Sequence, residues 1–70
     1  MKATIHGHTV SYDEKSVSSG ARYLSLELDG QEAKVFFDQA YSHGSATFED
    51  HMGYKYKLIH NGAEYSLVKA

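Results

Sequence analysis

The chain has no cysteine and no proline among its 70 residues. Without cysteine it can form neither a disulfide framework nor a thiolate metal site, which are the usual supports of a small secreted domain. The absence of proline removes the residue that most often interrupts a strand. The chain must therefore be stabilised by a hydrophobic core of its own or by a second chain.

Long apolar runs and a strong charge are also missing. Residues 1–6 lack the apolar stretch of a signal peptide, and no segment approaches the roughly 20 apolar residues of a membrane span. The net charge of −2 implies neither a general affinity for nucleic acid nor a high-charge mimic of DNA. We therefore expect a soluble protein in the cytoplasm of a bacterium or a phage-infected cell, with no membrane partner.

The dominant signal that is present is an alternation of apolar and polar residues, broken by turns that contain glycine. Residues 1–70 provide enough chain for a single small β domain. The hydrophobic share of 41% is enough to build one core.

Residues 22–38 predict a β-hairpin, because the central dipeptide Asp29-Gly30 favours a type I′ turn. Folding the chain at this turn places apolar residues on one side, namely Leu24, Leu26, Leu28, Val35 and Phe37. The turn and the apolar pattern favour the same register. On the opposite side of the hairpin, Tyr23 faces Phe36.

A second hairpin is predicted over residues 54–69, with Asn61-Gly62 as its turn. Its register pairs apolar residues on one side, Leu58 with Tyr65 and Tyr56 with Leu67. The lysines of this segment fall on the other side, so the hairpin has one wet face.

The N-terminal segment allows two interpretations. If His6-Gly7 is a turn, Ala3 pairs with Val10 on a neighbouring strand. The alternative is one strand that bends at a bulge around Gly7.

The remaining segments are short. Residues 13–20 are polar and predict a loop, residues 45–50 a short strand, and residues 51–53 a tight turn. Residues 38–44 predict either a loop or one helical turn that Asp38 caps.

Together these elements predict an all-β fold with at most one short helical turn. About five to seven short strands, each with one apolar face, must close into a small antiparallel barrel, bend strongly, or fold over as a sandwich. We favour the barrel or the strongly bent sheet, because two full layers need more chain. The expected core consists of Ile5, Val10, Leu24, Leu26, Leu28, Val35, Phe37, Phe48, Tyr56, Leu58, Tyr65 and Leu67.

Five histidines are the candidates for a metal-responsive or pH-responsive module. His6 and His8 would share one side of a straight strand, but a turn at Gly7 would separate them. The others stand next to a glycine or in a predicted turn, and these are His43, His51 and His60. Because no spacing matches an established zinc motif, we predict no metal site.

Patterns for catalysis and for cofactor binding are absent. No serine lies in a nucleophile elbow, and the isolated glycines match neither of the phosphate-binding loop motifs. A chain of this length also rarely encloses a substrate pocket. We therefore predict that the protein is not an enzyme and binds no cofactor.

Nucleic acid is the alternative partner. Small barrels bind single strands through aromatic side chains beside basic ones, and the candidate basic residues here are Arg22, Lys34, Lys55 and Lys57. Strand alternation in residues 54–57, however, sends the tyrosines to one face and the lysines to the other. The seven basic residues are also outnumbered by nine acidic ones, which makes nucleic acid the less favoured partner.

Residues outside the predicted core favour a protein partner. Tyr23 and Phe36 face away from the leucines, and exposed aromatic side chains supply a large contact area at low entropy cost. The further candidates outside the core are Glu27, Glu32, Tyr41, Ile59 and Val68. In an alternative interpretation the two rings form a second small core, and a homodimer that covers them would satisfy both interpretations.

The predicted function therefore follows from exclusion. A small domain without a cofactor motif, a catalytic constellation or a strong charge most often acts by binding another protein, as an inhibitor or an accessory factor. Immunity proteins and phage proteins that block host defence, such as anti-CRISPRs, are chains of this size. No residue of the sequence identifies the partner.

Overall fold

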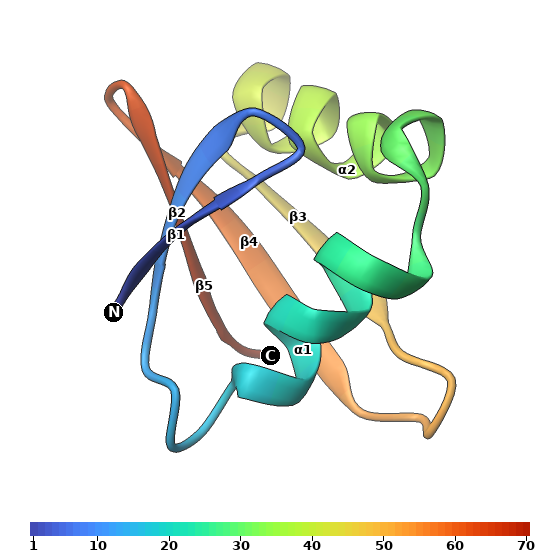
Figure 1. The fold of residues 1–70 in the computed structure, drawn as a ribbon. Helices are drawn as coiled ribbons and strands as arrows, with labels where there is room; N and C mark the ends of the chain where they lie inside the picture. The colour runs from blue at the N-terminus through green and yellow to red at the C-terminus, as the bar shows by residue number, and fades with distance from the viewer.

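A computed structural model describes all residues from 1 to 70 and shows a five-stranded sheet with helices packed on one face (Figure 1). The strands are β1 (Lys2–Ile5), β2 (His8–Tyr12), β3 (Ser45–Glu49), β4 (Lys55–Asn61) and β5 (Glu64–Lys69). The helical layer consists of α1 (Ser18–Arg22), the π-helical turn η1 (Tyr23–Glu27) and α2 (Gly30–His43). None of these helices has the length and apolar composition needed to cross a membrane.

The sheet is mixed and open. Its strand order is β1-β2-β5-β4-β3, in which β2 and β5 run parallel and all other neighbours run antiparallel. The prediction of a sheet-rich fold is confirmed, with 39% of the residues in strands, but the 34% in helices show that the all-β class was wrong. The predicted barrel does not form, because helices bury the apolar face that closure would otherwise have to cover.

The hairpin predicted over residues 22–38 is wrong, because this segment forms η1 and most of α2. Asp29 is the N-cap of α2, where its carboxylate accepts a hydrogen bond from the backbone N–H of Glu32 at 2.8 Å. The Glu32 carboxylate accepts in return from the backbone N–H of Asp29 at 3.1 Å. This reciprocal capping box starts a helix where the dipeptide Asp29-Gly30 suggested a turn.

Helical periodicity also changes the predicted core. The side chains of Leu26 and Val35 are 75% and 61% exposed, so their assignment to the core was wrong. Leu28 is half-buried, and the other nine expected core residues are buried. Leu26 and Val35 match a two-residue period, but in a helix the same spacing turns them toward solvent.

The end of α2 corrects a further prediction. Residues 38–44, predicted as a loop or a single turn capped by Asp38, contain the last turns of this helix. Gly44 then ends the helix in the left-handed conformation with φ 92°. Residues 13–20, predicted as a loop, include the first half of α1.

A hairpin forms at each end of the chain: the first selects the turn at His6-Gly7 over the bulged strand, and the second forms with a shifted register. His6 and Gly7 have φ values of 49° and 85°, as a type I′ turn requires, and Ala3 pairs with Val10. In the second hairpin Asn61 pairs with Glu64, so the turn lies one residue later than predicted and the register differs by two residues. A two-residue shift leaves the side chains of β4 and β5 on their expected faces.

The core lies between the sheet and the helical layer, and one glycine sets the distance between them. A Cβ at Gly20 of α1 would lie 2.7 Å from the ring of Tyr56 on β4. Real Cβ atoms essentially never come this close to another atom, so α1 reaches β4 only because residue 20 has no side chain.

The substitution Gly30→Ala distinguishes the observed helix at this position from the hairpin turn that the sequence suggested. Gly30 does not have a positive φ, and a Cβ there meets only His6 Nδ1 at 3.9 Å. We expect the substitution to raise the free energy of unfolding by about 0.4–1 kcal/mol, because alanine restricts the unfolded chain. Urea denaturation measures the change. A clear loss of stability would instead indicate a type I′ turn at this position.

Gly20→Ala should act in the opposite direction. Overpacking against the Tyr56 ring costs about 1–3 kcal/mol, which exceeds the roughly 1 kcal/mol that alanine gains over glycine in a helix. We therefore expect a lower urea midpoint than for the wild type. An unchanged or higher midpoint would show that α1 is not in contact with Tyr56.

Candidate functional site

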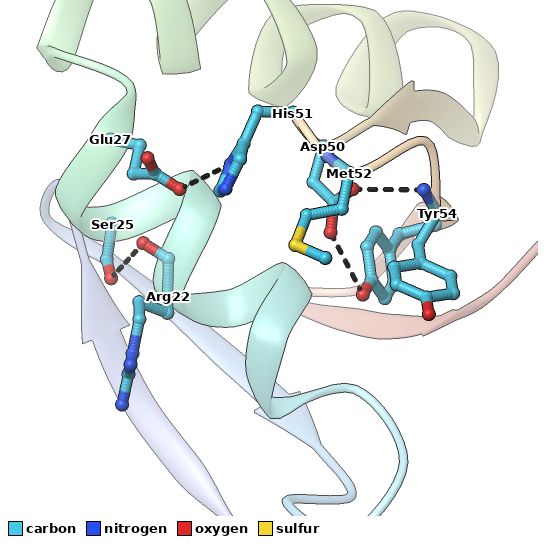
Figure 2. A network of polar contacts seen from close by, with 8 residues as sticks. Arg22, Ser25, Glu27, Asp50, His51, Met52 and Tyr54 are labelled. Atoms are coloured by element: carbon cyan, nitrogen blue, oxygen red, sulfur yellow. Dashed lines mark hydrogen bonds and ion pairs between the residues drawn. The ribbon is translucent and has the colours of Figure 1, made fainter.

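The turn between β3 and β4 is held by a buried carboxylate. Asp50 is only 8% exposed, and its Oδ1 atom accepts hydrogen bonds from the backbone N–H groups of Met52 and Tyr54, both at 2.9 Å (Figure 2). The hydroxyl of Tyr56 donates to Oδ2 over 3.4 Å. The backbone of the turn is therefore tied to β4 and to the core beneath it.

Two large side chains project from this turn into solvent. Met52 is 68% exposed and Tyr54 is 61% exposed. Gly53 between them has φ 89°, which lets the chain reverse direction. Because Asp50 bonds both flanking N–H groups, the turn presents the two side chains from a defined backbone conformation.

A hollow of about 360 Å³ lies between this turn and the helical segment α1–η1. Ser19, Arg22 and Glu27 line it from the helical side, and His51, Met52 and Tyr54 line it from the turn. The hollow therefore combines polar walls with a thioether and a phenol ring at its rim.

One close contact between a histidine and a carboxylate crosses the hollow. His51 Nδ1 lies 2.9 Å from Glu27 Oε2, and both side chains are substantially exposed. The Tyr23 ring lies next to this pair, with its centroid 6.2 Å from that of His51. Figure 2 shows Arg22 pointing away from the pair, so its guanidinium does not compete for the Glu27 carboxylate.

Two buried phenols have raised pKa values. Burial raises the pKa of Tyr56 above 10.0, and the negative charge of Asp50 raises it further. Burial also raises the pKa of Tyr65, with smaller contributions from Asp38 and Tyr41. Both phenols therefore resist ionisation in the folded protein.

Tyr23 and Phe36, the two rings predicted to bind a protein, are half-buried. Their centroids lie 6.1 Å and 5.3 Å from that of the buried Phe48 on β3. The two rings thus meet around Phe48 instead of facing each other across a hairpin. Both rings pack against the main core and form no separate second core.

The other predicted protein-binding residues are dispersed. Glu27 pairs with His51 at the hollow, whereas the carboxylate of Glu32 is part of the capping box of α2. Tyr41 is 67% exposed on α2, with its ring 4.8 Å from that of His60. The last two candidates lie on the open face of the sheet, and these are Ile59 and Val68.

The four basic residues of the nucleic-acid alternative do not form one surface. Arg22 lies on the helical side, and Lys34 pairs with Asp38 on α2 at 2.6 Å. Lys55 and Lys57 lie on β4 and point to the open face of the sheet.

The two histidines beside Gly7 contact the helical layer. His6 Nε2 lies 3.0 Å and 3.2 Å from the carbonyl oxygens of Leu24 and Leu28, so this nitrogen donates to the end of η1. The ring of His8 stacks on that of Phe37, with 4.2 Å between the two ring centroids. No group of three or more metal-ligating side chains is arranged to hold an ion.

Neither Met52 nor the role of Asp50 was predicted from the sequence, and Tyr54 was predicted to lie on the buried side of its hairpin. A signal was present, because an aspartate at the start of a turn commonly accepts from the backbone N–H two residues later. Asp50 followed by Gly53 fits this pattern.

Comparison with known proteins adds no relative: no family model, no curated protein and no solved structure matches this chain. Its function therefore has to be inferred from its own residues.

The raised pKa of Tyr56 predicts a loss of stability at alkaline pH. The folded state favours the protonated phenol, so its contribution is complete below pH 10 and is lost as the pH rises through the raised pKa. We expect Tyr56→Phe to flatten the decline of the unfolding free energy above pH 10. Equal slopes for the wild type and Tyr56→Phe would contradict the assignment.

Proposed function

We propose that this chain is a non-enzymatic protein-binding factor of the cytoplasm, which acts on its partner in a fixed stoichiometry as an inhibitor or accessory subunit. A phage anti-defence protein such as an anti-CRISPR, or an immunity protein, would be a factor of this kind. The observation that carries the proposal is the exposed pair Met52 and Tyr54 on a turn held by Asp50, beside an open hollow.

The chemistry of this surface suits a protein partner. Tyrosine and methionine are enriched at protein interfaces, where they bury large areas and adapt to the partner's shape. A turn whose backbone is already ordered loses less conformational entropy when it binds. The adjacent hollow offers space for a side chain of the partner.

The contact between His51 and Glu27 in the hollow supports binding more than catalysis. The His51 and Glu27 side chains are 61% and 45% exposed. Acid–histidine pairs catalyse reactions in sites that exclude water and align a nucleophile. The exposure of this pair instead fits polar contacts at the rim of an interface.

The binding surface proposed from the structure differs from the one that the sequence suggested. Tyr23 and Phe36 support Phe48, so replacing them would test stability together with binding. Met52 and Tyr54 are largely exposed, so replacing them should leave the fold intact.

The test is the double substitution Met52→Ser/Tyr54→Ser. The tagged protein and its variants are incubated with host extract, cross-linked, and compared by quantitative mass spectrometry. The partner found is then purified for calorimetry. We expect 1:1 binding and a Kd at least about tenfold weaker for the variant, since interface anchors contribute more than about 1.4 kcal/mol.

The matched control is Val35→Ser/Tyr41→Ser, which removes two equally exposed side chains from α2. It should bind the partner with nearly the wild-type Kd. Equal binding by both variants would refute the proposed surface. Tight binding of oligonucleotides that falls steeply with added salt would instead favour the nucleic-acid alternative.

A further inference from the structure

The edge strand β3 carries a row of backbone groups that have no partner. Its only neighbour is β4, since β3 ends the strand order of the sheet. The ladder is flanked by bonds from His60 N–H to the Gly44 carbonyl at 3.0 Å and from Asp50 N–H to the Tyr54 carbonyl at 2.9 Å. These two bonds show that the even-numbered residues of β3 direct their backbone N–H and C=O groups toward β4.

The odd-numbered residues therefore direct their backbone groups away from the sheet. The N–H and C=O groups of Ser45, Thr47 and Glu49 point to the free edge, because hydrogen-bonded and non-bonded pairs alternate along an antiparallel ladder. None of the backbone hydrogen bonds made outside the helices and strands involves these groups. Such a row of unpaired groups is a template for a further strand.

The two edges of the sheet differ in lysine: β1 carries Lys2, whereas β3 is one residue longer and Glu49 is its only charged residue. β1 is four residues long and begins with Lys2, and charged lysines on edge strands discourage pairing. β3 has the sequence Ser-Ala-Thr-Phe-Glu, which contains no lysine and no proline, and it pairs with β4 without a bulge.

We infer that two copies of this chain associate through β3, which pairs antiparallel with β3 of the second copy about a two-fold axis at Thr47. A two-fold arrangement of this kind is closed and joins the two sheets into one. The inference is independent of the proposed partner surface, because it involves the edge of β3 and not Met52 or Tyr54.

In this register the β3 side chains of one copy complement those of the second copy in size and charge. On the helical side, Ala46 lies opposite Phe48 of the second copy, so a small residue faces a large one. On the open face, Ser45 lies opposite Glu49 of the second copy and Thr47 lies opposite its own equivalent. Glu49 already pairs across the sheet with Lys55, so association brings no two like charges directly opposite each other.

Single-cysteine variants test the register, because the chain has no cysteine of its own. Opposed residues of a hydrogen-bonded antiparallel pair have Cα atoms about 5.5 Å apart, within the range for a disulfide. Thr47→Cys should therefore oxidise to a covalent dimer at least about tenfold faster than Thr4→Cys on β1, since pairing raises the local thiol concentration.

Two further cysteine variants exclude random collision. Ser45→Cys alone and Glu49→Cys alone should stay monomeric on oxidation, because four residues of strand separate each from its equivalent by roughly 13 Å. A mixture of the two variants should cross-link.

The mass in solution tests the association without a disulfide. Sedimentation equilibrium should give a mass that rises with concentration from 7.8 kDa toward twice that value. Thr47→Pro removes a backbone N–H that bonds nothing within the chain, so it should remain folded by circular dichroism and sediment as a monomer. Thr4→Pro on β1 is the control and should still associate.

Three results would overturn the inference: a wild-type chain that stays at 7.8 kDa at millimolar concentration, equal oxidation rates for Thr47→Cys and Thr4→Cys, or association that survives Thr47→Pro. None of these results would affect the proposed binding through Met52 and Tyr54. Loss of partner binding in Met52→Ser/Tyr54→Ser, with association retained, would likewise leave β3 as the dimer contact.

Discussion

The buried carboxylate of Asp50 connects the core of this protein with its candidate binding surface. Through Oδ1 it holds the backbone of the turn that carries Met52 and Tyr54, and through Oδ2 it accepts from Tyr56. The ring of Tyr56 in turn packs against α1 at Gly20. A charged group is costly to bury unless hydrogen bonds compensate it, so these bonds favour one conformation of the turn. The presentation of the surface thus depends on an interaction that begins in the core.

Much of the sheet could be predicted from the sequence because its signals are local. His6-Gly7 specifies one reversal, Asn61-Gly62 locates the other to within one residue, and alternation then assigns the faces. The dipeptide Asp29-Gly30 was ambiguous, because aspartate followed by glycine suits both a tight turn and a helix start. Glu32, three residues after Asp29, favours the helix through the capping box. The barrel could not be decided from strands alone, since closure depends on whether a helical layer covers the apolar face.

The candidate site was harder to predict than the fold. Tyr23 and Phe36 were expected near each other as neighbours on two paired strands. In the structure Tyr23 lies on η1 and Phe36 on α2, and both pack against Phe48. The hollow beside Met52 combines residues from η1 and the β3–β4 turn, which are distant in the sequence. Neither alternation nor turn chemistry contains this information. Only the packing of the helical layer on the sheet brings these residues together.

The central claim is that Asp50 fixes the turn in the form that a partner would bind. Amide hydrogen exchange of the free protein tests it most directly, because it measures how often the N–H groups of Met52 and Tyr54 open. The account predicts slow exchange at both amides in the wild type. In Asp50→Ala it predicts fast exchange at these two amides, while those of β4 and β5 remain protected. Fast exchange at both amides in the wild type would contradict the account.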